Sequence, residues 1–136
     1  RELLYRSHMT NADLVAFLHK TFQANGWPYT VELICDSAEP NRIEELCRAG
    51  FNAKPAVKDI KYGIDLVKSS VLHLDHQAVN GIKEIRGYSY KKDKEGRVLD
   101  VPVDAFNHFC DAMRYAIATS GERQPNASRL AKLIVR

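Results

Sequence analysis

The stretch Thr30–Pro40, TVELICDSAEP, decides the fold class. Its first six residues are rich in β-favouring side chains, in a run of the length expected for an inner strand, and the run ends at Asp36. Pro40 then introduces apolar residues at helical spacing. The stretch therefore predicts a strand that leads into a helix, with a carboxylate at the carboxyl end of the strand, where ligand sites of open α/β folds collect.

The same alternation of strand and helix patterns continues on both sides of this stretch. We expect helices over residues 10–25, 40–49, 59–68, 77–86 and 104–119, and strands over residues 2–7, 30–35, 51–57, 71–74 and 88–90. The charged segment 91–97 is expected to form the tip of a β-hairpin. This order predicts an α/β fold in one domain over residues 1–119, followed by a linker and a short basic tail over residues 120–136.

Composition and charge exclude several classes of protein. The 20 Lys and Arg residues against 17 Asp and Glu residues give a net charge of +3, which permits contact with nucleic acid without demonstrating it. No apolar run is long enough to cross a bilayer, so we expect no membrane partner. The three cysteines form no zinc-binding spacing, and no GxxxxGK[ST] loop is present that would indicate an ATPase motor.

The segment Asp104–Ile117, DAFNHFCDAMRYAI, carries much of the candidate chemistry. On a helix, Asp104, His108, Asp111 and Tyr115 are separated by four, three and four residues and therefore share one face. One interpretation is a solvated face with an N-capping aspartate. The other is a site for a hard divalent cation, in which carboxylates bind Mg²⁺ or Mn²⁺ and the histidine supplements them or orients a water.

Asp36 also has two interpretations. Aspartate is common in turns, where its side chain accepts hydrogen bonds from nearby backbone amides. Alternatively, Asp36 and Asp111 together place one carboxylate at a strand end and another on the closing helix. Two-metal nucleases use this arrangement, in which paired ions activate a water and stabilise the leaving oxygen of a phosphodiester.

Five segments, in this order along the chain, resemble the C-terminal nuclease domain of phage and prophage terminase large subunits. They are DSAEP from Asp36, KDIKYGI from Lys58, the stretch Glu84–Tyr90, DKEG from Asp93 and NHFCDAMRYA from Asn107. The first and the last are the most specific, and the similarity extends from about Glu2 to Ile117.

The resemblance implies a ribonuclease H-like three-layer fold, with a central mixed sheet flanked by helices and one or more N-terminal strands missing. It also implies a metal-dependent endodeoxyribonuclease that cuts double-stranded DNA during viral genome packaging, with two Mg²⁺ or Mn²⁺ ions held by three carboxylates. Asp36 matches the second carboxylate, Asp111 the third, and His108 a histidine one helical turn before the third.

The family's first carboxylate lies on the opening strand, and this chain offers no candidate for it. The segment Glu2–Ser7 resembles a later strand, and the chain opens on Arg1 rather than on methionine. We therefore expect that upstream sequence has been removed and that the fragment alone holds an incomplete catalytic site.

The partners that the resemblance implies are double-stranded DNA, the ATPase domain of the parent chain, the small terminase subunit and the portal, in the cytoplasm of a bacterial host. Contacts with DNA phosphates are predicted for basic residues before and within the third helix and in the hairpin, although many lysines on charged turns are only solvated. These residues are Lys58, Lys61, Lys91, Lys92, Lys94 and Arg97.

Two alternatives to the terminase hypothesis stay open. One is a non-catalytic module for DNA binding or packaging assembly, in which the carboxylates are structural. The other is a different ribonuclease H-like nuclease, such as a resolvase. Because missing sheet strands would leave a strand edge open, self-association of the fragment is also predicted.

Overall fold

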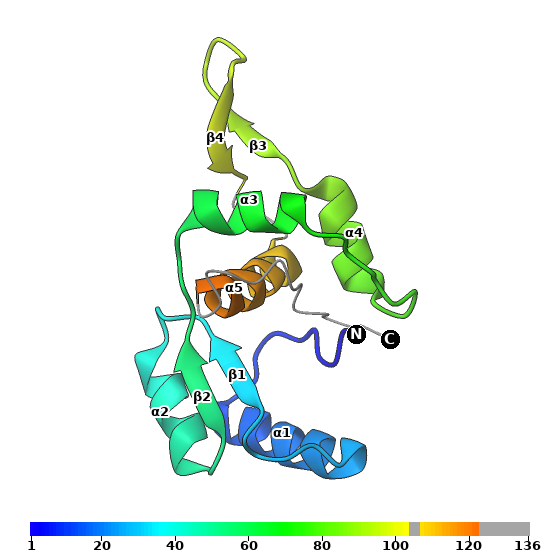
Figure 1. Cartoon of the computed structure of the whole chain (residues 1–136), viewed down its shortest axis with the longest axis vertical. Helices are drawn as coiled ribbons and strands as arrows, with labels where there is room; N and C mark the ends of the chain where they lie inside the picture. Colours follow the sequence, from blue (N-terminus) through cyan, green and yellow to red (C-terminus); the bar gives the residue numbers. More distant parts are fainter. Residues whose placement is uncertain (104–106, 123–136) are drawn as a thin grey trace. The chain divides into compact units, whose positions relative to one another are not determined.

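The computed structural model describes residues 1–103 and 107–122 (Figure 1). In chain order the elements are α1 (Asn11–Asn25), β1 (Glu32–Cys35), α2 (Pro40–Arg48), β2 (Asn52–Pro55), α3 (Ile60–Ser69), α4 (Val79–Gly87), β3 (Tyr90–Lys92), β4 (Val98–Pro102) and α5 (His108–Glu122). None of the helices within these ranges is long and apolar enough to cross a membrane.

The chain divides into two compact units, which are considered separately. Residues 6–58 form the first, called here the β1–β2 unit. Residues 1–5 and the described residues from 59 onward form the second, called here the α5 unit. The opening residues of the chain thus belong to the same unit as its last helix.

The β1–β2 unit is built on two parallel strands joined by α2. The register runs from Glu32 opposite Asn52 to Cys35 opposite Pro55. Parallel strands need a crossover connection, and α2 supplies it while it packs against β2. Because the strands are parallel, both end at the same edge, and the residues that follow them lie close together.

An aromatic cluster forms the core of the β1–β2 unit. Phe22 of α1 is almost fully buried and meets Trp27 and Phe51 edge-to-face, with ring centroids 5.6 and 5.2 Å apart. This is a favourable geometry for aromatic rings. Leu46 of α2 and Ala53 of β2 complete the buried cluster, so α1, α2 and the sheet share one core.

The α5 unit is built around α5, which packs against both α3 and α4 (Figure 1). Two glycines permit this close approach. A Cβ on Gly63 of α3 would lie 2.5 Å from Cγ of Arg114, and a Cβ on Gly81 of α4 would lie 2.6–2.8 Å from ring atoms of Phe109. Both distances are shorter than real contacts, so α5 can approach its neighbours only where they lack a side chain.

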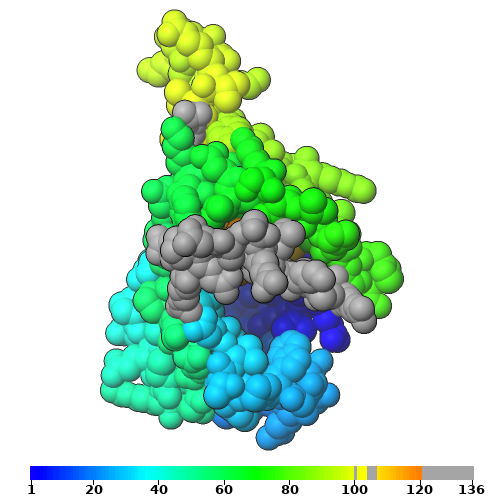
Figure 2. Space-filling view, viewed as in Figure 1, coloured from blue at the N-terminus to red at the C-terminus, as the bar shows by residue number. Residues whose placement is uncertain are grey.

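The antiparallel hairpin of β3 and β4 completes the α5 unit. Tyr90 pairs with Pro102 and Lys92 with Val98, and a turn over residues 93–97 joins the strands. Gly96 has a left-handed φ of 81°, and the side chain of Asp93 accepts hydrogen bonds from the amides of Glu95 and Arg97. The hairpin, yellow in Figure 2, projects from the rest of its unit.

The structure confirms the α/β class, all five helices and the hairpin, and corrects other details. The described strands form two two-stranded sheets, one parallel and one antiparallel, rather than one continuous sheet. The strands expected over residues 2–7 and 71–74 are wrong, since both segments are irregular and have no backbone partner strand. Large apolar side chains of both segments are also exposed, so neither run marks a buried strand: Leu3, Leu4, Tyr5, Val71 and Leu72.

The last helix also differs from its predicted bounds. It begins at His108, because the Asn107 carbonyl accepts the amide of Asp111 at 2.7 Å, and it continues to Glu122 rather than ending at Thr119. Asp104, predicted as its cap, and the tail over residues 123–136 lie outside the described residues.

Replacing Gly81 by alanine should destabilise the α5 unit although alanine is the better helix former. The new methyl group would collide with the ring of Phe109, and overpacking of this kind lowers the free energy of unfolding by about 1–3 kcal/mol. Urea unfolding measures the effect. Gly87→Ala, at the end of the same helix, is the matched control because its Cβ would meet nothing within 4 Å. Equal stability of the two variants would contradict the proposed contact.

Candidate functional site

Asp36 follows β1 at the edge where both parallel strands end. Its Oδ1 accepts the amide of Ala38 at 2.8 Å, as in an aspartate-stabilised turn, and lies 2.6 Å from the Nζ of Lys58. Lys58 follows β2. The Ala56 amide donates to the Cys35 carbonyl at 2.8 Å, which adds one more backbone hydrogen bond between the two strands just before Lys58. The Asp36 side chain is 44% exposed, so it remains accessible to a ligand.

Asp111 lies in the first turn of α5, and each of its oxygens accepts one hydrogen bond. Nη2 of Arg114 donates to Oδ1 at 2.8 Å, and Nδ2 of Asn107 donates to Oδ2 at 3.2 Å. A carboxylate has about four lone-pair sites, so these two donors leave room for a further ligand. The side chain is 27% exposed, so one face of the carboxylate is open.

Arg114 is a buried, charged residue of α5 that hydrogen-bonds to Asp111. Its side chain is 6% exposed, packs against Gly63, and has its guanidinium carbon 4.7 Å from the centroid of the Tyr115 ring. Its Nε and Nη1 find no hydrogen-bond partner within the part of the chain that the structure describes. Burial alone lowers the pKa of Arg114, but the hydrogen bond and attraction of Asp111 outweigh it, so the pKa is raised and the side chain stays charged.

Glu84 of α4, which the sequence analysis did not single out, is the buried carboxylate that fixes the start of α5. Its Oε2 accepts the amides of Phe109 and Cys110 at 2.6 and 3.3 Å, and its Oε1 accepts the hydroxyl of Tyr5 at 2.7 Å. The side chain therefore satisfies amides that a helix cannot bond within itself, and its negative charge suits the positive end of the helix dipole.

Glu2 has the corresponding role at the start of α4. Its Oε2 accepts the amide of Gly81 at 2.8 Å, and its Oε1 accepts Nδ2 of Asn80 at 2.6 Å. The opening segment thus makes side-chain bonds to α4 and, through Tyr5, to Glu84. Sequence motifs for capping look a few residues from the helix start, so neither distant glutamate could be found in that way.

Two other titratable groups beside Asp111 are kept protonated. Burial raises the pKa of the Cys110 thiol to about 11, and Glu84 and Asp111 add to the effect. Burial also raises the pKa of Tyr88, again with a contribution from Asp111. At neutral pH neither group is a nucleophile, so the chemistry available at this end of α5 is that of its carboxylate and of His108.

The remaining predicted site residues lie on the surface. His108 is exposed as the first residue of α5 and precedes Asp111 by one helical turn. Lys61 is exposed in the first turn of α3. Four exposed basic residues lie on the projecting hairpin: Lys91, Lys92, Lys94 and Arg97.

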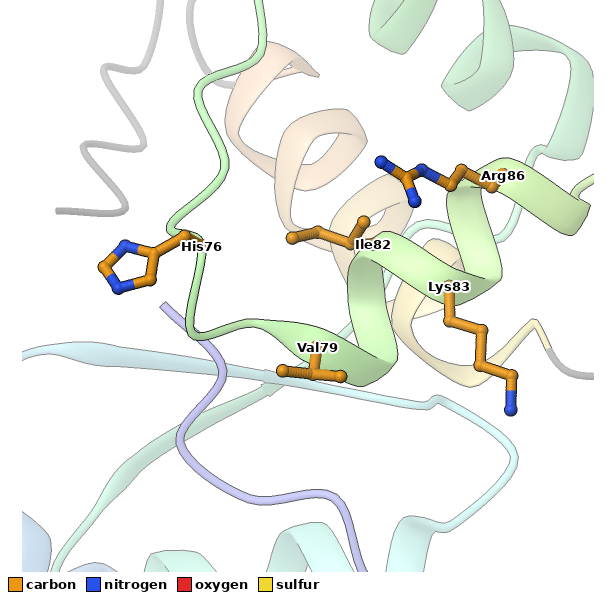
Figure 3. A pocket seen from close by; sticks show the side chains of 5 residues that line it. All are labelled: His76, Val79, Ile82, Lys83 and Arg86. Carbon is orange, nitrogen blue, oxygen red and sulfur yellow. The ribbon is translucent and has the colours of Figure 1, made fainter.

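A shallow hollow of about 420 Å³ lies along α4 (Figure 3). It is lined by His76, Val79, Ile82, Lys83 and Arg86. The lining contains no carboxylate and none of the predicted site residues. The candidate residues therefore form two separate groups, one around Asp36 in the β1–β2 unit and one around the start of α5 in the α5 unit.

The predicted metal ligands fall into both units. Asp36 belongs to the β1–β2 unit, and His108 and Asp111 belong to the α5 unit. Within residues 1–103 and 107–122, no group of three His, Cys, Asp or Glu side chains is arranged to hold a metal ion. The assignment of these three residues to one metal site stays a prediction.

Comparison with known proteins establishes the fold. No family model and no curated protein sequence matches the chain. Its structure is similar to the crystal structure of the nuclease domain of g2p, the large terminase of bacteriophage SPP1, determined with bound Mn. The TM-score is 0.71 at 23% sequence identity, over 89% of this chain and 67% of the SPP1 chain. The chain thus has the same α/β fold as that SPP1 domain.

Replacing Glu84 by glutamine should destabilise the α5 unit. The amide can accept fewer of the three bonds and carries no charge for the helix dipole, so we expect the free energy of unfolding to fall by about 1.5–3 kcal/mol in urea denaturation. Glu95→Gln, on the exposed hairpin turn, removes the same charge and is the control. A loss of similar size in both variants would show that Glu84 acts only through net charge.

Proposed function

We propose that this chain is the nuclease domain of a viral large terminase and hydrolyses phosphodiester bonds of double-stranded DNA during genome packaging. The fold similarity to a Mn-bound terminase nuclease domain is the observation that carries the proposal. Residues 1–119 would form the nuclease domain, acting in the cytoplasm of a bacterial host. Its partners would be the terminase ATPase domain, the small subunit and the portal.

The donor chemistry of the site fits divalent cations. Asp36 and Asp111 offer accessible carboxylate oxygens, the ligands that Mg²⁺ and Mn²⁺ prefer, and we assign them as metal ligands. When bound, such cations lower the pKa of a water and stabilise the charge on the leaving oxygen. His108, exposed one turn before Asp111, is placed to supplement the carboxylates or to hold a water by a ring nitrogen.

The basic residues are proposed to hold the DNA backbone. Lys58 follows β2 in the β1–β2 unit. In the α5 unit Lys61 lies in the first turn of α3, and the projecting hairpin adds four more basic side chains. Contacts of this kind bind phosphates and carry no sequence information. We therefore expect DNA binding that depends strongly on salt and little on sequence.

The second candidate function is a DNA-binding or packaging-assembly module without catalysis. It is favoured by the ion pairs of Asp36 with Lys58 and of Asp111 with Arg114, which would give both carboxylates a structural role. The two functions differ in their response to metal. A binding module holds DNA equally well with Mn²⁺ or EDTA and nicks no plasmid in either.

Replacing Asp111 by asparagine should weaken Mn²⁺ binding by about tenfold or more, because the neutral amide is a poor ligand for a hard cation. Isothermal titration calorimetry of the chain with MnCl₂, in the presence of a short phosphorothioate DNA duplex that resists cleavage, measures the affinity. Asp65→Asn, at an exposed position of α3, removes the same charge in the same unit and is the control. Equal affinity in the wild type and in Asp111→Asn would exclude a metal site at this carboxylate.

Plasmid nicking with Mn²⁺ tests the activity itself. Because this chain offers no candidate for the family's first carboxylate, we expect nicking only from a terminase protein that supplies one. In that protein EDTA should abolish nicking, and Asp36→Asn or Asp111→Asn should reduce it by at least about 100-fold, since each assigned carboxylate serves the transition state as well as the metal. DNA binding without nicking by that protein, with Mn²⁺ bound, would favour the assembly module.

A further inference from the structure

Each carboxylate that we assign to the metal site is paired with a basic side chain of its own unit. Arg114 donates to Asp111 at 2.8 Å, and the Nζ of Lys58 lies 2.6 Å from Asp36. A divalent cation bound to either carboxylate would therefore be placed within a few ångströms of a positive charge. Repulsion at such distances is appreciable even near a protein surface.

Arg114 cannot withdraw from this position. Its stem packs against Gly63, its guanidinium lies over the ring of Tyr115, and the side chain is 6% exposed. A guanidinium group stays protonated in proteins, so Arg114 carries its positive charge here. The charge opposite Asp111 is thus a fixed property of the folded unit.

Lys58 differs because its side chain is 43% exposed. Its charge opposes a cation at Asp36, but a partner with many closely spaced negative charges could attract the ammonium group away. The phosphate backbone of duplex DNA is such a partner, and Lys58 is among the residues proposed to contact DNA.

We propose that Arg114 and Lys58 are counter-charges that make Asp111 and Asp36 weak ligands for free divalent cations, so that stable cation binding requires the added negative charge of a DNA phosphate. This inference rests on the proposed function, since it takes the two aspartates as metal ligands. It adds that the site discriminates between the presence and absence of DNA before any bond is broken.

A purely positioning role for Arg114 has the opposite consequence. If the guanidinium only orients the carboxylate, its removal should loosen Asp111 and weaken cation binding. If it acts as a counter-charge, its removal should strengthen cation binding. The sign of the change therefore decides between the two roles.

The experiment measures Mn²⁺ affinity by calorimetry with and without a short phosphorothioate DNA duplex, which resists cleavage. For the wild type we expect the duplex to tighten Mn²⁺ binding by at least about tenfold. Arg114→Met should tighten binding without DNA by about tenfold and reduce the gain from DNA. Arg114→Lys, which keeps the charge, should stay close to the wild type.

Controls separate the inference from net charge and from folding. Arg86→Met removes a charge from α4 in the same unit and should leave Mn²⁺ affinity unchanged. Urea unfolding reports whether Arg114→Met is folded. If it is not, Lys58→Met at its half-exposed position provides the same test for Asp36, with Arg48→Met on α2 as its control.

The outcomes also separate this inference from the proposed function. Unchanged or weaker Mn²⁺ binding in folded Arg114→Met and Lys58→Met, together with a loss in Asp111→Asn, overturns the counter-charge role alone. Equal Mn²⁺ binding in the wild type and in Asp111→Asn overturns the metal site and the inference with it.

Discussion

Glu84 satisfies the first amides of α5 with a carboxylate that is only 5% exposed, and the geometry of the α5 unit depends on this contact. A buried carboxylate is stable only when its oxygens are bonded, and Glu84 receives two backbone amides and the Tyr5 hydroxyl. The contact joins α4, α5 and the opening segment. Because Glu84 fixes the start of α5, it also fixes the position of Asp111 in the first turn of that helix.

The close packing around α5 explains how a charged residue can be buried in so small a unit. Gly63 lets the aliphatic part of the Arg114 side chain lie between α3 and α5. Gly81 lets the ring of Phe109 lie between α4 and α5. A buried ion pair is costly to assemble because both charges lose water, so it contributes little to stability by itself.

Local rules predicted those parts of the fold that local interactions decide. Thr10 and Asp59 cap α1 and α3, and the strand–helix order around Asp36 is the one expected. The roles of Glu2 and Glu84 could not be predicted from local patterns. Their carboxylates accept hydrogen bonds from groups that lie 25 to 79 positions away in the sequence. The segment 71–74 was mistaken for a strand because an apolar run has no strand character without a neighbouring strand to pair with.

Sequence patterns also found the candidate carboxylates but not the pairing of Asp36 with a charged residue. Asp36 and Asp111 could be found because a strand end and a helical spacing mark them. Lys58, predicted only as a DNA contact, gains its role at Asp36 from the register of β1 and β2, since Cys35 faces Pro55 and both strands end at one edge. Because β1 and β2 are parallel, the residues that follow both strands lie at the same edge of the sheet. Asp36 and Lys58 are therefore brought together there. The charge beside Asp36 is therefore set by a residue 22 positions away in the sequence.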